Sequence, residues 1–541
     1  MAGARVRRLL ATLVFLAVSA GLARAAEPPR LVVFVAIDGL PQRQLLAVRP
    51  HLAPDGLARF LDRGAWFAQA HYGHAYTLTA PGHAAMLTGA YPHRTGIVAN
   101  EWLDPATGAP SYNTADPRHR YIGHATHPLN GTSPRNLLAE TVGDVLRRTD
   151  PRAKVIAISG KDRGAILPAG RLGTAYMYMA QTGSFASSSY YMPRHPDWVD
   201  AFHAARPADR WFRSEWKPLL PDAAYAGAVP DDPPWFGRRG GRLPMRMASP
   251  DDETPGPAYY GALLRSPFAD QLALEFALAA VRGEGLGRDA VPDLLVVSLS
   301  GHDYVNHAYS AESRLSQDHL LQVDRLLQAF FHEIDALVGR GRWLAALTSD
   351  HGFMPAPEVL RAQSVEAGRL QPGHMVARVN AELERRFGAA LVVGSPGSGL
   401  LVDRPAAAAL GLDPHRVAEA ARQALLREPG IAAAYTRREL ETDALPQAPH
   451  FAALRRSWHP ERSADVQYVV QPGWMLGSAV ATHGSPHPYD THVPILLWGP
   501  GWVKPGRVDA RVEVVDIAPT LAVLLGLPPP AASEGRALPL P

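Results

Sequence analysis

Acidic and histidine side chains form four short clusters in this sequence that are suited to holding metal ions. They are Asp38 in VAIDG, Asp303 and His307 in HDYVNH, Asp350 and His351 in TSDHG, and His483 in THGSPHPYDTHVP. Asp303 and His307 are four residues apart, so on a helical turn they share one face. A lone aspartate is more often a cap or a turn residue. Four such clusters, with mixed carboxylate and imidazole ligands, indicate a zinc site with two metal ions.

Two hydroxyl groups and two cations complete the set of reactive side chains. Thr79 lies in YTLTAPGHAAMLTG, two residues after Thr77. Pro81 suits the first turn of a helix, which we expect to begin near Thr79 and to run to about residue 87. Thr79 would sit at the positive end of that helix, where the local sequence favours a capping role. Lys161 and Arg163 stand in KDRGAILPAG, which on its own is equally typical of an exposed basic turn.

These clusters follow or precede short apolar runs of the kind that form buried parallel strands. The runs are Leu31–Ile37, Lys154–Ile158, Leu294–Leu299, Trp343–Leu347 and Val493–Trp498. Helical patterns lie between them, from Ser133-Pro134 to Arg148, over Phe268–Arg282 and over Ser313–Val338. The alternation predicts an α/β fold, a doubly wound and mostly parallel sheet flanked by helices. Ligands bind such sheets beyond the carboxyl ends of the strands, which is where the clusters fall.

Two segments interrupt the alternation. Residues 170–262 are rich in Tyr, Trp, Pro and Arg, with weak periodicity, and we expect an inserted cap segment near the entrance of the site. Residues 355–475 carry their own helix and strand pattern, which predicts a small α+β subdomain. Residues 26–541, including these two insertions, are expected to form one catalytic domain.

The composition is that of a globular protein, with 541 residues, 47% hydrophobic and 19% charged. The net charge of +3 comes from residues 1–25, which hold four arginines and no acid. Without them the chain carries 50 basic and 51 acidic side chains, so the charge does not indicate nucleic-acid binding. The absence of cysteine excludes disulfides, thiolate metal ligands and a cysteine nucleophile.

The amino terminus has the pattern of a cleavable secretory signal peptide. Three arginines precede an apolar stretch from Leu9 to Ala20, and Ala23-Arg24-Ala25 predicts cleavage after Ala25. An uncleaved anchor is the alternative, but the apolar stretch is shorter than the roughly 20 residues needed to span a bilayer. We therefore expect a periplasmic or secreted protein without a membrane anchor in its mature chain.

Taken together and in order, AIDG, TLTAPGH with GIVANEW, SGKDRGAILPAG, HDYVNH, SDHG and HGSPHPYDTHVP resemble the alkaline phosphatase superfamily. The chain is most similar to its phosphate-irrepressible bacterial alkaline phosphatase branch, which is related to nucleotide pyrophosphatase/phosphodiesterases. The resemblance implies two zinc ions per chain, one held by Asp303, His307 and His483 and the other by Asp38, Asp350 and His351.

The same resemblance makes Thr79, not Thr77, the nucleophile that binds metal and becomes phosphorylated. Two Zn²⁺ ions would be balanced by three aspartates and one threonine alkoxide, which favours ionisation of the hydroxyl. The resemblance also implies that Asn100, Lys161 and Arg163 are both catalytic and substrate-binding, because in the family such residues contact the phosphoryl oxygens. The diesterase relatives lack the Lys/Arg pair.

These residues predict an enzyme that hydrolyses a broad range of small-molecule phosphate monoesters to an alcohol and inorganic phosphate. A phosphodiesterase or nucleotide pyrophosphatase is the alternative within the superfamily, and a catalytically inactive metal-dependent binding protein is the alternative outside enzymes. A sulfatase would need a cysteine or serine in place of Thr79.

Overall fold

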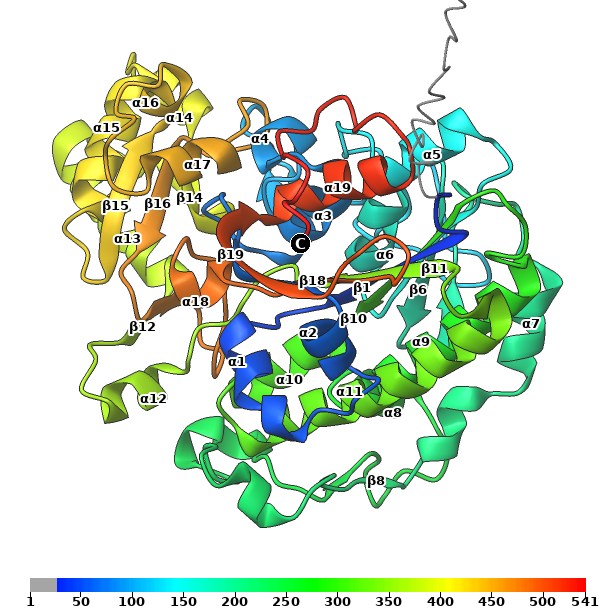
Figure 1. Cartoon of the computed structure of the whole chain (residues 1–541). Helices are drawn as coiled ribbons and strands as arrows, with labels where there is room; N and C mark the ends of the chain where they lie inside the picture. Colours follow the sequence, from blue (N-terminus) through cyan, green and yellow to red (C-terminus); the bar gives the residue numbers. More distant parts are fainter. Residues whose placement is uncertain (1–26) are drawn as a thin grey trace, which may run out of the picture.

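Nine strands form one mixed sheet through the middle of the molecule (Figure 1). The computed structural model describes residues 27–541, so the predicted signal peptide lies outside the described residues. In spatial order the strands are β19 (Gly506–Glu513), β2 (Ala65–His71), β18 (Ile495–Trp498), β11 (Trp343–Thr348), β1 (Leu31–Ile37), β10 (Asp293–Leu299), β5 (Val155–Ser159), β6 (Thr174–Met179) and β7 (Ser184–Ala186). The five strands from β11 to β6 are parallel, and β18 runs antiparallel to both of its neighbours.

The central strands are apolar at every position because each face of the sheet is covered. In β1, Leu31, Val33, Val35 and Ile37 belong to one hydrophobic core, whereas Val32, Phe34 and Ala36 belong to the other. Side chains alternate between the faces of a strand, so a strand covered on both sides has no polar face. The expected doubly wound α/β fold is confirmed.

Helices cover the two faces in separate layers (Figure 1). One layer holds α3 (Thr79–Thr88), α5 (Val142–Thr149), α6 (Asp162–Ala169) and α19 (Ile517–Leu524). The other holds α1 (Gln42–Ala47), α2 (Ala58–Arg63), α8 (Pro257–Leu263), α9 (Pro267–Glu284), α10 (Gly301–Tyr309) and α11 (Arg314–Ile334), with α7 (Asp197–Ala204) packed against α9. Among residues 27–541, no helix has the length and apolar character that a membrane span requires.

A second, four-stranded sheet lies beside the first, with its own hydrophobic core. Its strands are β13 (Val392–Gly394), β14 (Gly399–Val402), β16 (Val466–Val470) and β15 (Ile431–Thr436). The helices of this region are α13 (Pro372–Phe387), α14 (Arg404–Ala409), α15 (Pro414–Leu425), α16 (Arg437–Glu441) and α17 (Phe451–Ser457). We call it the side subdomain. The strand β17 (Trp474–Leu476), paired with β12 (Gly368–Leu370), follows it in the chain.

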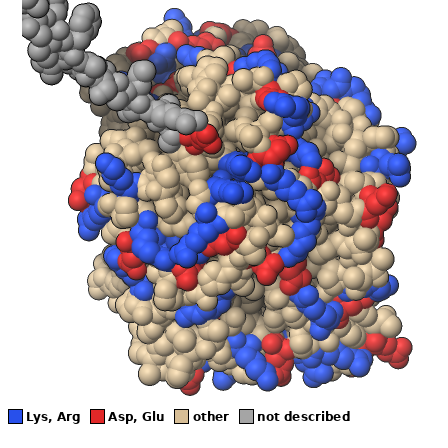
Figure 2. Space-filling view, turned by 45° about the vertical axis from the view of Figure 1, so that its right-hand side comes forward, with Lys and Arg blue, Asp and Glu red and all other residues tan. Residues whose placement is uncertain are grey.

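Short elements complete the chain. They are α4 (Pro92–Thr95), β3 (Glu101–Leu103), β4 (Pro110–Tyr112), β8 (Glu215–Trp216), β9 (Met245–Arg246), α12 (Pro357–Ala362) and α18 (Pro488–Thr491). Figure 2 shows one face of the surface, where lysine and arginine are numerous and acidic side chains lie among them.

The structure corrects two expectations. The helix expected from Ser133 begins only at Val142, because Ser133 donates its hydroxyl to Asp116 and Thr141 provides the capping box with Asp144. The segment 170–262 is not wholly an insertion, since β6 and β7 within it are strands of the central sheet. Its later part packs on α11, where Asp318 accepts a hydrogen bond from the Trp216 indole.

Candidate active site

The predicted metal ligands converge at one edge of the central sheet. Asp38 follows β1, Asp350 comes two residues after β11, and α10, which follows β10, carries Asp303 and His307. His483 precedes β18, and because β18 is antiparallel to β11, its beginning lies at the carboxyl end of β11. The order of the strands therefore brings together residues from distant parts of the chain.

Asp303, His307 and His483 form one group of three side chains. The Nε2 atoms of His307 and His483 lie 3.3 and 3.6 Å from Oδ1 of Asp303. Burial alone would raise the pKa of Asp303, but its electrostatic interactions with the His307 ring and the Lys161 ammonium outweigh burial and hold the pKa well below its usual range. This carboxylate therefore stays ionised, as a metal ligand must.

Asp38, Asp350 and His351 form the neighbouring group. Nε2 of His351 lies 3.5 Å from Oδ1 of Asp38 and 3.3 Å from Oδ2 of Asp350. Burial, together with the neighbouring Asp350 carboxylate, raises the pKa of Asp38 well above its usual range. Two buried carboxylates this close repel one another, and a divalent cation between them would remove that repulsion.

All three predicted histidine ligands are oriented in the same way by the backbone. Their Nδ1 atoms lie 3.0 Å from the Ala481 oxygen for His307, 2.9 Å from the Gly352 oxygen for His351 and 2.7 Å from the Thr77 oxygen for His483. A carbonyl can only accept, so Nδ1 of each ring must carry the proton. The lone pair is therefore on Nε2, the atom that faces the carboxylates, which is the arrangement typical of metal-binding histidines.

The donor atoms of this cluster fit a metal ion by a second criterion. Within the described chain, several of its buried polar atoms have no hydrogen-bond partner: Oδ1 of Asp38, Oδ1 of Asp303 and Nε2 of His351. Leaving such atoms unpaired in a protein interior is costly. Coordination of a cation would satisfy all of them, because each carries a free lone pair.

His83 lies beside the second group, but its hydrogen bonds leave it no lone pair for a metal. Nδ1 lies 2.9 Å from the Thr79 carbonyl oxygen and must donate to it, while Nε2 is 2.8 Å from the Ser298 hydroxyl. With one ring nitrogen donating and the other bonded to a hydroxyl, His83 holds the first turn of α3 in place. This geometry favours a structural role for His83 and a ligand role for His351.

A further group of histidines elsewhere lacks this pattern. His195, Asp200 and His203 lie close enough together to share an ion. However, Nε2 of His195 accepts from the Ser187 N–H and Nε2 of His203 accepts from the Phe185 N–H. Their lone pairs are occupied, so the protonated Nδ1 atoms cannot bind a metal.

Lys161 places its ammonium between the two groups. Nζ lies 2.8 Å from Oδ2 of Asp38 and 2.5 Å from Oδ2 of Asp303, and the Tyr304 ring lies 5.0 Å away. Burial would lower the pKa of Lys161, but Asp303 and Asp38 outweigh it and raise the pKa. Lys161 therefore contacts the Oδ2 atoms of both aspartates, whereas the histidine Nε2 atoms face their Oδ1 atoms.

Thr79 is the first residue of α3 and is buried, and its neighbours in the chain contact both ligand groups. The carbonyl of Thr77 is bonded to His483, in the first group. Three residues after Thr79, a Cβ atom at Gly82 would lie only 2.1 Å from the Asp350 carbonyl oxygen, in the second group. The glycine therefore allows α3 to approach the loop that carries Asp350. No side chain caps α3, and the N-cap residue is Leu78, so Thr79 does not have the capping role that its local sequence alone favoured.

Asn100 and Arg163 lie beside the start of α3 and α6, respectively. Oδ1 of Asn100 accepts the Ala80 N–H at 2.9 Å, which directs its amide N–H groups away from the helix. Nη1 of Arg163 donates to the Tyr112 hydroxyl at 3.2 Å, and Tyr112 in turn donates to Asp162. The structure thus fixes an amide donor and a guanidinium at the edge of the cluster.

Two residues that support the site, Tyr112 and Asp490, were not among the predicted site residues. Tyr112, at the end of the short strand β4, orients Arg163, and no periodicity in the sequence around it marks it. Asp490 lies within THGSPHPYDTHVP, and its Oδ2 accepts from the Gly484 and Ser485 backbone N–H groups, which fixes the loop after His483. An acid so close to a predicted ligand in the same motif was a usable signal.

Comparisons with known proteins agree with this arrangement. Residues 32–492 match the family model described as type I phosphodiesterase / nucleotide pyrophosphatase. The chain is 31% identical to alkaline phosphatase PhoV of Synechococcus elongatus, over 94% of this chain and 92% of that protein. It is 30% identical to alkaline phosphatase PafA of Elizabethkingia meningoseptica, over 95% and 94%.

The fold is also that of a solved structure. The crystal structure of wild-type alkaline phosphatase PafA superposes with a TM-score of 0.87 at 29% sequence identity, and the match covers 95% of this chain and 99% of that one. The similarity therefore includes the side subdomain as well as the central sheet.

Proposed function

We infer the chemistry of the site from the premise that the chain belongs to the type I phosphodiesterase/nucleotide pyrophosphatase family, within the alkaline phosphatase superfamily. Its similarity to named alkaline phosphatases extends over nearly the whole chain, and the chain is a phosphate monoester hydrolase. The observation that carries the proposed mechanism is the common orientation of His307, His351 and His483, each protonated at Nδ1 and presenting Nε2 to the aspartates.

We assign two Zn²⁺ ions to the cluster. Asp303, His307 and His483 would hold one, and Asp38, Asp350 and His351, together with the Thr79 oxygen, would hold the other. When bound, the ions supply positive charge that stabilises the buried carboxylates, polarises a phosphoryl oxygen and lowers the pKa of a nearby hydroxyl or water.

The chain's own residues then perform a double displacement. The Thr79 hydroxyl gives up its proton and its oxygen attacks phosphorus; a bond forms between them, the bond from phosphorus to the alcohol oxygen breaks, and the alcohol leaves with a proton that balances the one lost by Thr79. Water next attacks the phosphothreonine, the bond from phosphorus to the Thr79 oxygen breaks, and inorganic phosphate is released. The positive end of α3 favours the anionic groups at Thr79 throughout.

Three side chains are suited to binding the phosphoryl oxygens. Asn100 offers amide N–H groups, and Lys161 and Arg163 offer positive charge to a group that carries two negative charges in a monoester. A diester carries one charge and a second substituent, so the same cations stabilise it less. Small-molecule phosphate monoesters are therefore the proposed substrates, with diester hydrolysis as the alternative. The signal peptide predicted in residues 1–25 supports a periplasmic or secreted location.

The nucleophile is tested by replacing each threonine in turn. Thr79→Ala should abolish phosphomonoester hydrolysis and the covalent intermediate, whereas Thr77→Ala should retain most of the rate, because its backbone carbonyl still accepts from His483. Acid-quenched enzyme, digested and analysed by mass spectrometry, should contain phosphothreonine at residue 79. Normal turnover by Thr79→Ala, or a phosphoryl group at another residue, would disprove the assignment.

A further inference from the structure

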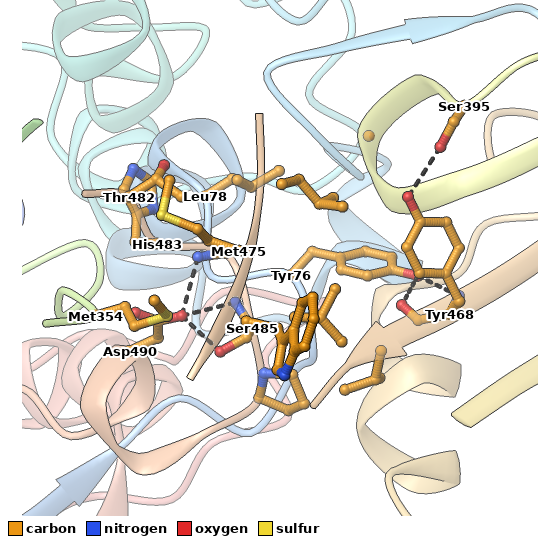
Figure 3. Close-up of a pocket in the computed structure, with 17 residues that line it drawn as sticks. Tyr76, Leu78, Met354, Ser395, Tyr468, Met475, Thr482, His483, Ser485 and Asp490 are labelled. Carbon is orange, nitrogen blue, oxygen red and sulfur yellow. Dashed lines mark hydrogen bonds between the residues drawn. The ribbon is translucent and has the colours of Figure 1, made fainter. Parts of the chain in front are cut away.

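A cavity of about 240 Å³ lies between the loop of residues 482–486, which carries His483 and which we call the catalytic loop, and the side subdomain (Figure 3). His483 and Leu78 line it on the side of the active site, and Tyr468 and Trp474 line it on the side of the subdomain. His483 carries one of the proposed metal-binding nitrogens, and Leu78 directly precedes the proposed nucleophile. The cavity therefore shares a wall with the catalytic centre.

The walls of the cavity are aromatic and apolar, with a few polar groups. In Figure 3, Tyr76 and Tyr468 lie on one side, and Met354, Met475 and His483 lie on the other. Two buried polar atoms of lining residues, Oδ1 of Asp490 and Nε1 of Trp474, have no hydrogen-bond partner among residues 27–541. Pockets of this composition, mostly apolar with a small number of polar atoms, are typical of binding sites for organic groups.

The residues proposed to bind the phosphoryl oxygens do not line this cavity. Asn100, Lys161 and Arg163 contact the start of α3, the aspartates and Tyr112, respectively. A monoester whose phosphoryl group lies at Thr79 thus has its polar end bounded by these three residues. The cavity at Leu78 and His483 offers space for the other end of the molecule, the alcohol.

We propose that this cavity is the subsite for the organic group of the substrate and that it selects phosphate monoesters of ring-bearing alcohols over those of small aliphatic alcohols. The proposal rests on the proposed function of the site. A dry cavity of about 150 Å³ is large enough to hold benzene, so a cavity of 240 Å³ accommodates one aromatic or sugar ring with its substituents. Contact with the Trp474 and Tyr468 rings would favour a flat group.

The cavity is tested by filling it. Leu476 lines the cavity from β17 and is half-buried, so Leu476→Trp adds volume there. Leu527→Trp is the matched control, because Leu527 is also half-buried but lies beyond α19, away from the cavity. The zinc-loaded enzyme and both variants are assayed with phenyl phosphate and methyl phosphate, and the binding of phenylphosphonate and methylphosphonate is measured by calorimetry.

Leu476→Trp should lower kcat/KM for phenyl phosphate about tenfold or more and weaken phenylphosphonate binding to a similar degree. The kcat/KM for methyl phosphate and the affinity for methylphosphonate should change by less than about twofold. The control variant should change neither the two kcat/KM values nor the two affinities. Trp474→Leu, which removes an aromatic wall, should shift the phenyl-to-methyl ratio in the same direction. Equal changes for phenyl and methyl compounds, or no change in either variant, would overturn the proposal.

The phosphonates separate this proposal from the function on which it rests. Failure of the wild-type enzyme to hydrolyse either monoester would refute the proposed function, yet both phosphonates would still report on the cavity. If wild-type protein binds phenylphosphonate no more tightly than methylphosphonate, the cavity is not the subsite.

Discussion

At each of the three proposed histidine ligands, a backbone carbonyl determines which ring nitrogen can bind a metal ion. The carbonyl oxygens of Ala481, Gly352 and Thr77 accept from Nδ1, so Nε2 is free. His195 and His203 show the opposite case, because backbone N–H groups occupy their Nε2 lone pairs. The closeness of the potential ligand atoms does not distinguish the two clusters. They differ in whether the backbone accepts a hydrogen bond from Nδ1 of each histidine or donates one to Nε2.

The cations at the edge of the site lead to a prediction about specificity. Lys161→Ala/Arg163→Ala should reduce monoester kcat/KM by more than the roughly 10²–10³-fold expected for loss of one preorganised donor. Diester hydrolysis should fall much less, because Thr79 and the proposed metal ligands remain. Rates with p-nitrophenyl phosphate and its diester analogue, at subsaturating concentration, give the ratio.

The zinc content of that double variant is the control and should be unchanged. Equal proportional losses for the two substrates would show that Lys161 and Arg163 have a structural role, for which their contacts with Asp38 and Tyr112 would provide the explanation.

His74 leads to a prediction about stability and pH. Its side chain is 0% exposed, and neither ring nitrogen has a hydrogen-bond partner within residues 27–541. Burial lowers the pKa of His74 to about 3, against about 6.5 in the unfolded chain. Between these values the unfolded chain binds a proton that the folded chain excludes, so the free energy of unfolding falls as the pH decreases through this window.

Replacement by a ring that does not titrate should remove this contribution. Between pH 7.5 and pH 5, the free energy of unfolding of the wild-type protein should fall by about 2 kcal/mol more than that of His74→Phe. The size of this difference follows from pH 5 lying about 1.5 units below the pKa of the unfolded histidine. Urea unfolding with a chelator present at both pH values measures it, since metal release then does not contribute. If the free energies of unfolding of the two proteins fall by the same amount between the two pH values, the prediction is wrong.

At the scale of the elements, the central strands were predictable, whereas the edge strands and some of the helix boundaries were not. The central strands are covered on both faces, so their sequences are continuous apolar runs with a distinctive signal. The edge strand β19 is mostly exposed and polar, and nothing in GRVDARVE distinguishes it from a loop. The helix start at Ser133 was wrong because Asp116, remote in the sequence, binds the Ser133 hydroxyl.

The candidate site was more predictable than the edge strands of the sheet. Its aspartates and histidines, which are common metal ligands, stand directly beside the ends of strands that the sequence marks clearly. Asp38, Asp303 and Asp350 each follow a strong strand signal. The cavity beside His483 was not predictable, because its walls come from strands of the side subdomain whose packing against the catalytic loop depends on the whole fold.

The contact between α3 and the Asp350 loop leads to a prediction at this scale. In Gly82→Ala, the new methyl group would meet the Asp350 carbonyl oxygen at 2.1 Å, and neither backbone can give way without moving the helix. We expect a loss of about 1–3 kcal/mol of stability and a fall in kcat/KM of about 10²-fold, because Thr79 moves with α3.

Gly261→Ala in α8 is the matched control, since no heavy atom lies within 4 Å of its added Cβ. This variant should be neutral or slightly more stable and fully active. Chemical denaturation and steady-state kinetics on both variants check the pair. A fully active Gly82→Ala would show that the position of α3 does not control the nucleophile.

At the scale of the whole molecule, the proposed metal ions join segments that are otherwise connected only through the sheet. Asp38 lies near the beginning of the described chain and His483 near its end, and α10 and the β11 loop lie between them. An ion bound by side chains from several elements stabilises the folded state only, and its free energy of binding adds to that of folding.

We therefore predict that metal analysis finds two zinc ions per active chain and that chelation abolishes activity and lowers the melting temperature. Added zinc should restore both. The loss of activity and the shift in melting temperature should follow the same dependence on chelator concentration, since one set of side chains is responsible. One ion or none in fully active enzyme would disprove the two-metal mechanism.

The wide separation of Asp38 and His483 along the chain also has a consequence for biosynthesis. A ribosome makes Asp38 early and His483 close to the end, and β18, which positions the latter, is made later still. A growing chain therefore cannot assemble the complete set of ligands before its synthesis is nearly finished. Binding of both proposed metal ions would therefore come late, and the compartment in which the chain completes its folding would determine which ions it encounters.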